Sequence, residues 1–152
     1  FTVESYAPTT VNALNATSII VKMTHKDPKT GKETVYMSTG DATGTGFQIT
    51  VSTFGDYMKA DLMQIAHHGY TTWHNNQGTI KAYRMMAAPT LIWPQGSNAN
   101  PNYVNKDYNK AAWDLASNPN YKEMYVAGKE GDVIIFPMPY AVGSATVSRV
   151  QK

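Results

Sequence analysis

The sequence has 152 residues, of which 42% are hydrophobic and 11% aromatic, enough apolar material for the core of one globular domain. Its 13 basic and 11 acidic residues give a net charge of +2, which is too balanced to indicate a charged partner. Cysteine is absent, so any metal must be held by His, Asp or Glu. No apolar run approaches the roughly 20 residues that cross a bilayer, so we expect no membrane insertion by this segment.

Tyrosine, methionine and asparagine are frequent, while only 16% of the residues are charged. This composition is typical of an extracytoplasmic bacterial protein, although the first residues show no signal-peptide pattern. Because the sequence begins at Phe1 and not at a methionine, we expect it to be either a processed product or a piece of a longer chain.

The first part of the chain is predicted to form strands. Residues 1–6 alternate like a strand and stop at a proline. Residues 17–23 and 34–38 are rich in β-branched and apolar side chains, and the spacer 26–32, with its proline and glycine, predicts a hairpin connection between them.

The middle of the chain alternates helices with strands. Residues 47–58 combine β-branched side chains with helical spacing, and we favour a helix. A short strand is predicted at 61–66, a helix at 77–87 that stops before a proline, and a strand at 90–93. Catalytic residues are then expected at strand ends.

The last third is predicted to contain a helix at 106–116 and a closing strand pair, 123–126 with 132–136, around the glycines of 128–131. The residues after Pro139 have weak strand character. The whole pattern predicts an α/β protein with a mixed β-sheet flanked by helices.

Three of the four histidines, His67, His68 and His74, fall within eight positions directly after the predicted strand 61–66. A neutral imidazole is a good ligand for zinc, manganese or iron, and its second nitrogen needs a neighbour to fix the tautomer. Adjacent residues of a regular strand point to opposite faces, so only one of His67 and His68 is expected to be a ligand. The other histidine or Asp61 is a candidate neighbour, and His68 is also a candidate substrate contact. The simpler alternative is a surface turn with incidental histidines.

Gly40-Asp41 follows the predicted strand 34–38 in the same manner. A carboxylate at a strand end can bridge two cations or orient a metal-bound water. Gly-Asp is also common in ordinary turns, where the aspartate caps a helix or binds the backbone. The metal interpretation of Asp41 therefore depends on His67, which follows one helix and one strand later.

Other chemistry has less support. Residues 44–46 read Gly-Thr-Gly but lack the lysine and spacing of a phosphate-binding loop. No Gly-any-Ser-any-Gly element marks a nucleophile. The three tryptophans, Trp73, Trp93 and Trp113, are expected to be core residues and not a stacking platform.

In order and spacing, four segments resemble the metallo-β-lactamase superfamily, and particularly the hydrolase domain of ComEC-type competence proteins. In that family a strand entry containing asparagine is followed by a strand ending in Gly-Asp, a helix, a strand ending in His-His-Gly, and a strand introduced by proline. The segments are residues 15–21, 36–41, 60–69 and 89–93.

The resemblance implies that residues 1–152 are one partial domain, the C-terminal half of an αββα sandwich. It also implies that Asp41 is shared by two zinc or manganese ions in the intact parent, that His67 binds the second ion, and that His68 assists catalysis. The superfamily's His-any-His-any-Asp-His motif is absent. We therefore expect the missing N-terminal half to be a partner, and this chain alone to bind metal weakly or not at all.

Two functions remain open. In the first, the chain is the C-terminal portion of a hydrolase that cleaves phosphoesters or nucleic acid with metal-activated water, and it is inactive in isolation. In the second, it is a non-catalytic binding or assembly module with a degenerate hydrolase fold, which covers its apolar surface by binding a partner or forming a homo-oligomer.

Overall fold

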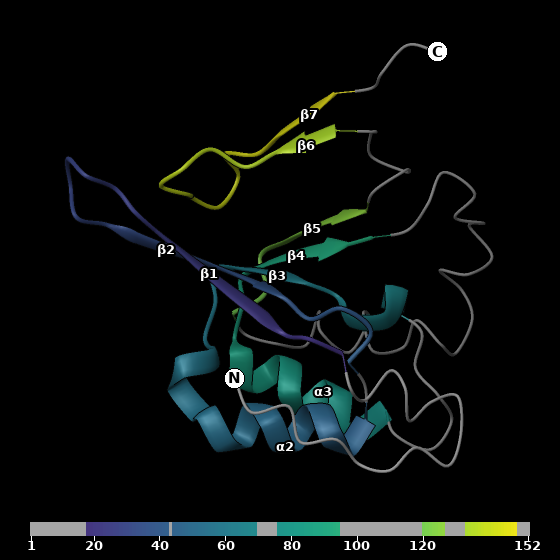
Figure 1. Cartoon of the computed structure of the whole chain (residues 1–152). Helices are drawn as coiled ribbons and strands as arrows, with labels where there is room; N and C mark the ends of the chain where they lie inside the picture. The colour runs from purple at the N-terminus through teal and green to yellow at the C-terminus, as the bar shows by residue number, and fades with distance from the viewer. Residues whose placement is uncertain (1–17, 43, 70–75, 95–119, 127–132, 149–152) are drawn as a thin grey trace.

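The structure is a computed structural model that describes residues 18–42, 44–69, 76–94, 120–126 and 133–148. Within these ranges, a mixed five-stranded sheet has two α-helices on one side and a two-stranded sheet on the other (Figure 1). The predicted α/β class with a mixed sheet is confirmed. The strand predicted at 1–6 and the helix predicted at 106–116 lie outside the described residues.

The larger sheet has the strand order β1-β2-β3-β4-β5. β1 and β2 form an antiparallel hairpin, and the steps from β2 to β5 are all parallel. Parallel neighbours need a connection that crosses one face of the sheet, and here helices provide two of these crossings. The strands are β1 (Val21–Lys26), β2 (Glu33–Ser38), β3 (Leu62–Gln64), β4 (Thr90–Trp93) and β5 (Glu123–Val126).

The two crossing helices are α2 (Gly44–Phe54), between β2 and β3, and α3 (Asn76–Met86), between β3 and β4. A 3-10 turn, η1 (Gly55–Met58), continues α2, so the helix predicted at 47–58 is confirmed with a tighter last turn. None of the helices in the described part of the chain has the length and apolar character that a bilayer crossing requires.

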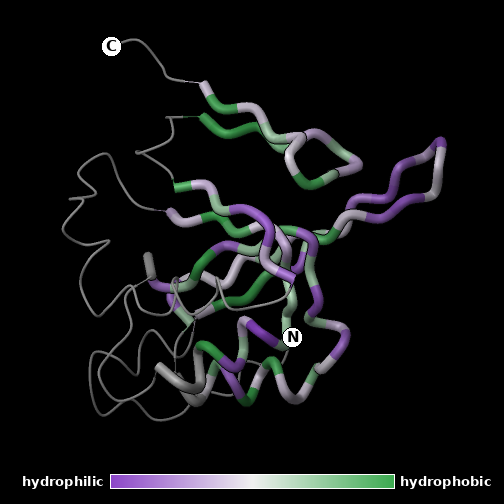
Figure 2. Tube along the Cα trace, turned by 180° about the vertical axis from the view of Figure 1, so that it is seen from behind, coloured by the Kyte–Doolittle hydropathy of each residue, from purple (hydrophilic) through white to green (hydrophobic). Residues whose placement is uncertain are grey.

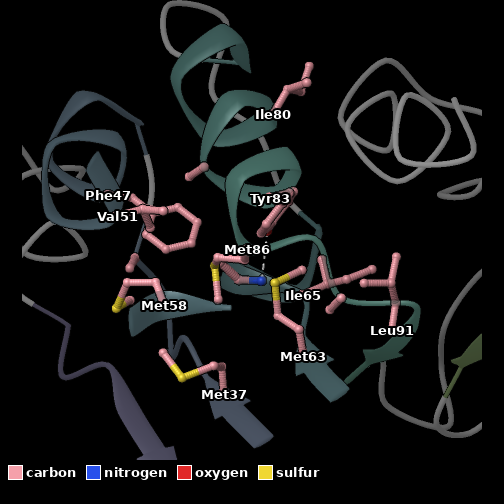
Figure 3. Packing of buried hydrophobic residues seen from close by; sticks show 14 of the residues in the cluster. Met37, Phe47, Val51, Met58, Met63, Ile65, Ile80, Tyr83, Met86 and Leu91 are labelled. Atoms are coloured by element: carbon pink, nitrogen blue, oxygen red, sulfur yellow. Dashed lines mark hydrogen bonds between the residues drawn. The ribbon is translucent and has the colours of Figure 1, made fainter. Parts of the chain in front are cut away.

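The hydrophobic core lies between the helices and the sheet (Figure 3). Side chains alternate along a strand, so every second strand residue points to the helices, while α2 and α3 each contribute residues three or four positions apart. The rings of Phe47 on α2 and Tyr83 on α3 meet edge to face, with centroids 5.7 Å apart. Trp93 is buried, as expected. The other large core residues include Met37, Val51, Met63, Ile65, Met86 and Leu91.

The β1–β2 connection is held by Asp27. Its Oδ1 accepts the backbone N–H groups of Lys29 and Thr30 at 2.8 and 2.7 Å, and these bonds lower the pKa of the Asp27 carboxyl. Gly31 completes the turn with a φ of 72°. The predicted hairpin is therefore confirmed, although β1 begins four residues later than the predicted 17–23 strand.

β6 (Val133–Ile135) and β7 (Thr146–Ser148) form a separate antiparallel sheet. It lies over the face of the larger sheet that the helices leave open, and Figure 2 shows the same separation from behind. The prediction that 123–126 pairs with 132–136 is wrong, because β5 pairs with β4 and β6 pairs with β7. The strand character after Pro139 is confirmed by β7.

Candidate functional site

The two segments that carry Asp41 and His67 follow the carboxyl ends of β2 and β3, which are parallel neighbours in the sheet (Figure 1). In these strands Tyr36 lies opposite Leu62 and Met37 opposite Met63. The backbone N–H of His67 donates to the carbonyl of Gly40 at 2.9 Å. The structure therefore brings the two predicted positions together.

Hydrogen bonds from side chains also join these two segments. The Ser38 hydroxyl donates to Oε1 of Gln64, and the Thr39 hydroxyl donates to the Gln64 carbonyl, both at 2.8 Å. Asp41 is half-buried, and its backbone N–H donates to the Ser18 hydroxyl at 3.2 Å. The backbone around Asp41 is thus held from β3 on one side and from the entry to β1 on the other.

Gly40 makes the turn into Asp41 possible. Its φ is +52°, a left-handed conformation that glycine adopts without steric cost. A Cβ at this position would lie 3.4 Å from Cβ of Ser18 and 3.5 Å from the carbonyl oxygen of Ile19. The glycine therefore serves both the backbone conformation and the close approach of the chain before β1.

His67 also has an unusual backbone, with a φ of +48°. Histidine is one of the residues that enter this region more often than most, at a cost of about 1 to 3 kcal/mol that neighbouring structure must offset. The side chain of His67 is half-buried, and its Nδ1 atom is buried. The position is thus fixed by the fold and is not part of a loose surface turn.

The strand does not continue through the histidines. β3 ends at Gln64, and Ala66–Gly69 form a 3-10 turn, η2, that contains both His67 and His68. The alternation of a regular strand therefore does not apply to these two residues, and it does not decide which of them is a ligand. The side chain of His68 and the whole of His74 lie outside what the structure describes.

Tyr83 of α3 supports the turn from the core side. Its phenolic oxygen accepts the backbone N–H of Ala66 at 2.8 Å, directly before His67. Burial raises the pKa of Tyr83, and the bond from Ala66 lowers it to a smaller extent, so the phenol stays protonated at neutral pH. No sequence pattern indicates this role, because a tyrosine at helical spacing is typical of an ordinary core residue.

Two residues considered from the sequence lie elsewhere. Asp61 precedes β3, at the end of that strand opposite to His67, and its carboxylate accepts the backbone N–H of Val35 at 2.8 Å. The interpretation of Asp61 as the neighbour that orients His67 is therefore wrong. His25 pairs with Thr34 near the β1–β2 turn, and so it belongs to the amino end of β2.

A second polar cluster, which no sequence motif indicated, lies at the amino ends of β4 and β5. The Glu123 carboxylate accepts hydrogen bonds from the Thr90 hydroxyl at 2.8 Å, from Gly143 N–H at 3.0 Å, and from the hydroxyls of Tyr125 and Tyr140. Burial raises the pKa of Glu123, but these donors outweigh it and lower the pKa overall. Burial and the bond to Glu123 raise the pKa of Tyr140.

The donor set at the Asp41–His67 position fits a metal only in part. A carboxylate and an imidazole are both accepted by zinc and manganese, but protein zinc sites use three or four protein ligands. Among the described residues, no group of three or more His, Cys, Asp or Glu side chains comes together. Asp41 and His67 are therefore two candidate ligands only, and further ligands would have to come from outside the described residues.

No family model, curated protein or solved structure matches this chain. The geometry above and the resemblance of the motifs are therefore the grounds on which a function can be proposed.

Proposed function

We propose that this chain is the C-terminal portion of a metal-dependent hydrolase of the metallo-β-lactamase type, in which Asp41 and His67 bind zinc or manganese. The observation that carries the proposal is the 2.9 Å hydrogen bond from His67 N–H to the Gly40 carbonyl. It joins the ends of two adjacent parallel strands, where ligand-binding residues of open α/β sheets gather.

A bound metal would supply an acidified water and polarise the scissile group of a phosphoester or nucleic-acid substrate. In this proposal the carboxylate of Asp41 and the imidazole of His67 would hold the metal. Ser18, Thr39 and Gln64 hold the backbone of the Asp41 segment, while Tyr83 holds the backbone next to His67. His68 would contact the substrate.

The remaining ligands are proposed to come from an N-terminal half of the same domain, in an αββα sandwich. The position of β6 and β7 over the open face of the larger sheet supports this architecture (Figure 1). A two-stranded sheet alone is marginally stable, so additional strands beside β6–β7 would complete a second layer.

A non-catalytic assembly module is the second candidate, and exposed apolar side chains favour it. Ile19, Met23 and Ile135 are 69%, 53% and 56% exposed. Surfaces of this kind are usually covered by a partner or by another copy of the chain. In this alternative Asp41 and His67 are structural turn residues.

Calorimetric titration of the 152-residue chain with zinc and with manganese tests the proposal. We expect weak, saturable binding of metal that Asp41→Asn and His67→Gln abolish. Asp56→Asn and His25→Gln are the matched controls, because both positions are exposed and neither lies at the carboxyl ends of β2 and β3. Equal binding by Asp41→Asn and by the parent chain would overturn the proposal and favour the assembly module.

Hydrolysis of a phosphodiester reporter is the second measurement. The isolated chain is expected to show negligible turnover, since two protein ligands cannot complete the site. Tight, stoichiometric binding accompanied by turnover would show instead that the described pair is part of a complete site within this chain.

A further inference from the structure

A pocket of about 540 Å³ lies on the face of the larger sheet that the helices do not cover. Its floor comes from β1 to β4, and two residues after β6 close it from above. This volume lies within the range of small-molecule sites, roughly 300 to 1,000 Å³. The lining residues are Met23, Thr24, His25, Thr34, Tyr36, Leu62, Ile92, Phe136 and Met138.

The strand register separates the pocket into a polar end and an apolar body. His25 lies opposite Thr34 in the row nearest the β1–β2 turn. The next row, two residues along, is apolar and consists of Met23, Tyr36 and Leu62. Ile92 belongs to the row after that, level with Gln64, so the floor spans about 13 Å from polar to apolar end.

The polar end offers hydrogen-bond donors. The Thr34 oxygen accepts the backbone N–H of Tyr140 at 2.9 Å, and the hydrogen of its own hydroxyl bonds no other described residue. It is therefore free to donate to a ligand. The imidazole of His25, in the same row, is exposed and supplies a second donor.

A lysine ammonium lies near this end of the pocket. The ammonium of Lys32 donates to the Tyr140 carbonyl at 3.0 Å, and the N–H of the same tyrosine binds Thr34. Residues 26–33 contain three lysines and two acids, which gives this segment a net charge of +1. The ammonium of Lys32 favours an anionic group on a ligand.

We propose that this pocket binds a small apolar carboxylic acid, with its carboxylate at the His25–Thr34 end and its apolar body over Leu62 and Ile92. Met23 and Met138 adapt to the shape of an acyl chain or of fused rings, because the thioether side chain is unbranched and flexible. Phe136 provides an apolar cover whose ring is held edge to face by Tyr125 and Tyr140. The site uses neither Asp41 nor His67.

The test uses the 152-residue chain, the fluorescent aryl sulfonate 1-anilinonaphthalene-8-sulfonate, and decanoate as competitor. We expect the dye to bind at one site and decanoate to displace it. Decanol and decylamine, which share the chain but lack the anion, are expected to compete at least about fivefold less well. Equal competition by decylamine would overturn the assignment of an anionic ligand, and absence of dye binding would overturn the site.

Two variants locate the binding. Ile92→Trp fills the apolar body and is expected to weaken decanoate by about tenfold or more, whereas Ile49→Trp on the exposed face of α2 leaves it unchanged. His25→Ala is expected to weaken decanoate roughly fivefold with little effect on decanol, with Lys81→Ala, an exposed position on α3, as control.

Near-ultraviolet circular dichroism checks that each variant is folded. If Ile92→Trp does not fold, Met23→Trp blocks the same pocket from the edge strand, where the native side chain is 53% exposed. Unchanged decanoate affinity in a folded blocking variant would place the ligand elsewhere. Dye binding that appears only with concentration-dependent association, measured by sedimentation, would assign the surface to a second copy of the chain and overturn the proposal.

Discussion

Gly40 and His67, which follow β2 and β3, both have a left-handed backbone conformation, and the N–H of His67 donates to the carbonyl of Gly40. This hydrogen bond joins the segment of Asp41 to that of His67, although 26 residues separate the two. Backbone conformations of this kind persist only where the surrounding structure holds them. The loss of unfolding free energy on substitution therefore measures how strongly the surrounding structure stabilises these positions.

Gly40→Ala is expected to lower the free energy of unfolding by about 1 to 2 kcal/mol, because an L-residue is strained in the left-handed backbone of this position. The added Cβ would lie 3.4 Å from Cβ of Ser18, which is an ordinary van der Waals contact. Gly55→Ala is the matched control, since Gly55 has the same φ of +52° and a Cβ added there would meet nothing within 4 Å. Urea unfolding should therefore show similar losses in the two variants. A clearly larger loss in Gly40→Ala would show that the contact with Ser18 is unfavourable.

Tyr83→Phe removes the acceptor of the Ala66 N–H and leaves that group buried. The expected loss is about 1 to 3 kcal/mol of unfolding free energy, together with weaker metal binding if the proposed ligand His67 shifts. Tyr57→Phe is the control, because Tyr57 is 56% exposed and keeps the ring that lies beside Lys22. A stability equal to that of the control would show that Ala66 finds another partner.

At the scale of elements, the amino and carboxyl ends of the parallel strands have different roles. The carboxyl ends of β2 and β3 carry Asp41 and His67, whereas the amino ends of β4 and β5 carry the Glu123 cluster. That cluster fastens the segment around Tyr140 and Gly143 to the sheet. The stabilising cluster and the proposed chemistry are thus located at opposite ends of the parallel strands of one sheet, on different strands.

The Glu123 cluster predicts a dependence of stability on pH. The pKa of Glu123 is lower in the folded chain than in the unfolded chain, so its contribution is fully present above the ordinary glutamate pKa of about 4.3 and is lost as the pH falls through the lower, folded value. Urea unfolding at neutral pH and below about pH 4 should therefore show a decrease that Glu123→Gln reduces.

Glu33→Gln is the control for this measurement, because Glu33 is exposed and its ion pair with Lys26 spans 3.9 Å. Exposed pairs of this kind contribute little. An acid-induced loss of the same size in Glu123→Gln and in the parent chain would show that other carboxyl groups cause it.

Local sequence patterns predicted the bounds of the strands better than they predicted which strands pair with each other. β4 and β5 have the predicted bounds, and the positions of Asp41 and His67 followed from strand ends in a parallel sheet. The pairing of β5 with β6 was predicted wrongly, because neighbouring strands with a glycine-rich spacer resemble a hairpin. The bond between Thr90 and Tyr140 joins residues 50 positions apart, and no local pattern indicates it.

At the scale of the whole molecule, the face of the larger sheet away from the helices has only a partial cover. β6 and β7 lie over it, yet Val133, Ile135 and Val147 remain 39%, 56% and 41% exposed. A two-stranded sheet with apolar residues on its surface has few contacts to stabilise it. The missing cover is a partner segment in the first functional proposal and a second copy in the alternative.

Ile135→Glu separates these outcomes. If copies of the chain cover β6–β7 mutually, sedimentation should show association that increases with concentration, and the buried carboxylate should shift the protein to monomer, since a charge is costly in an apolar interface. Ile49→Glu, on the exposed side of α2, should leave association unchanged. A parent chain that stays monomeric at all concentrations would contradict self-assembly through β6–β7 and leave this surface for the N-terminal half of the proposed hydrolase.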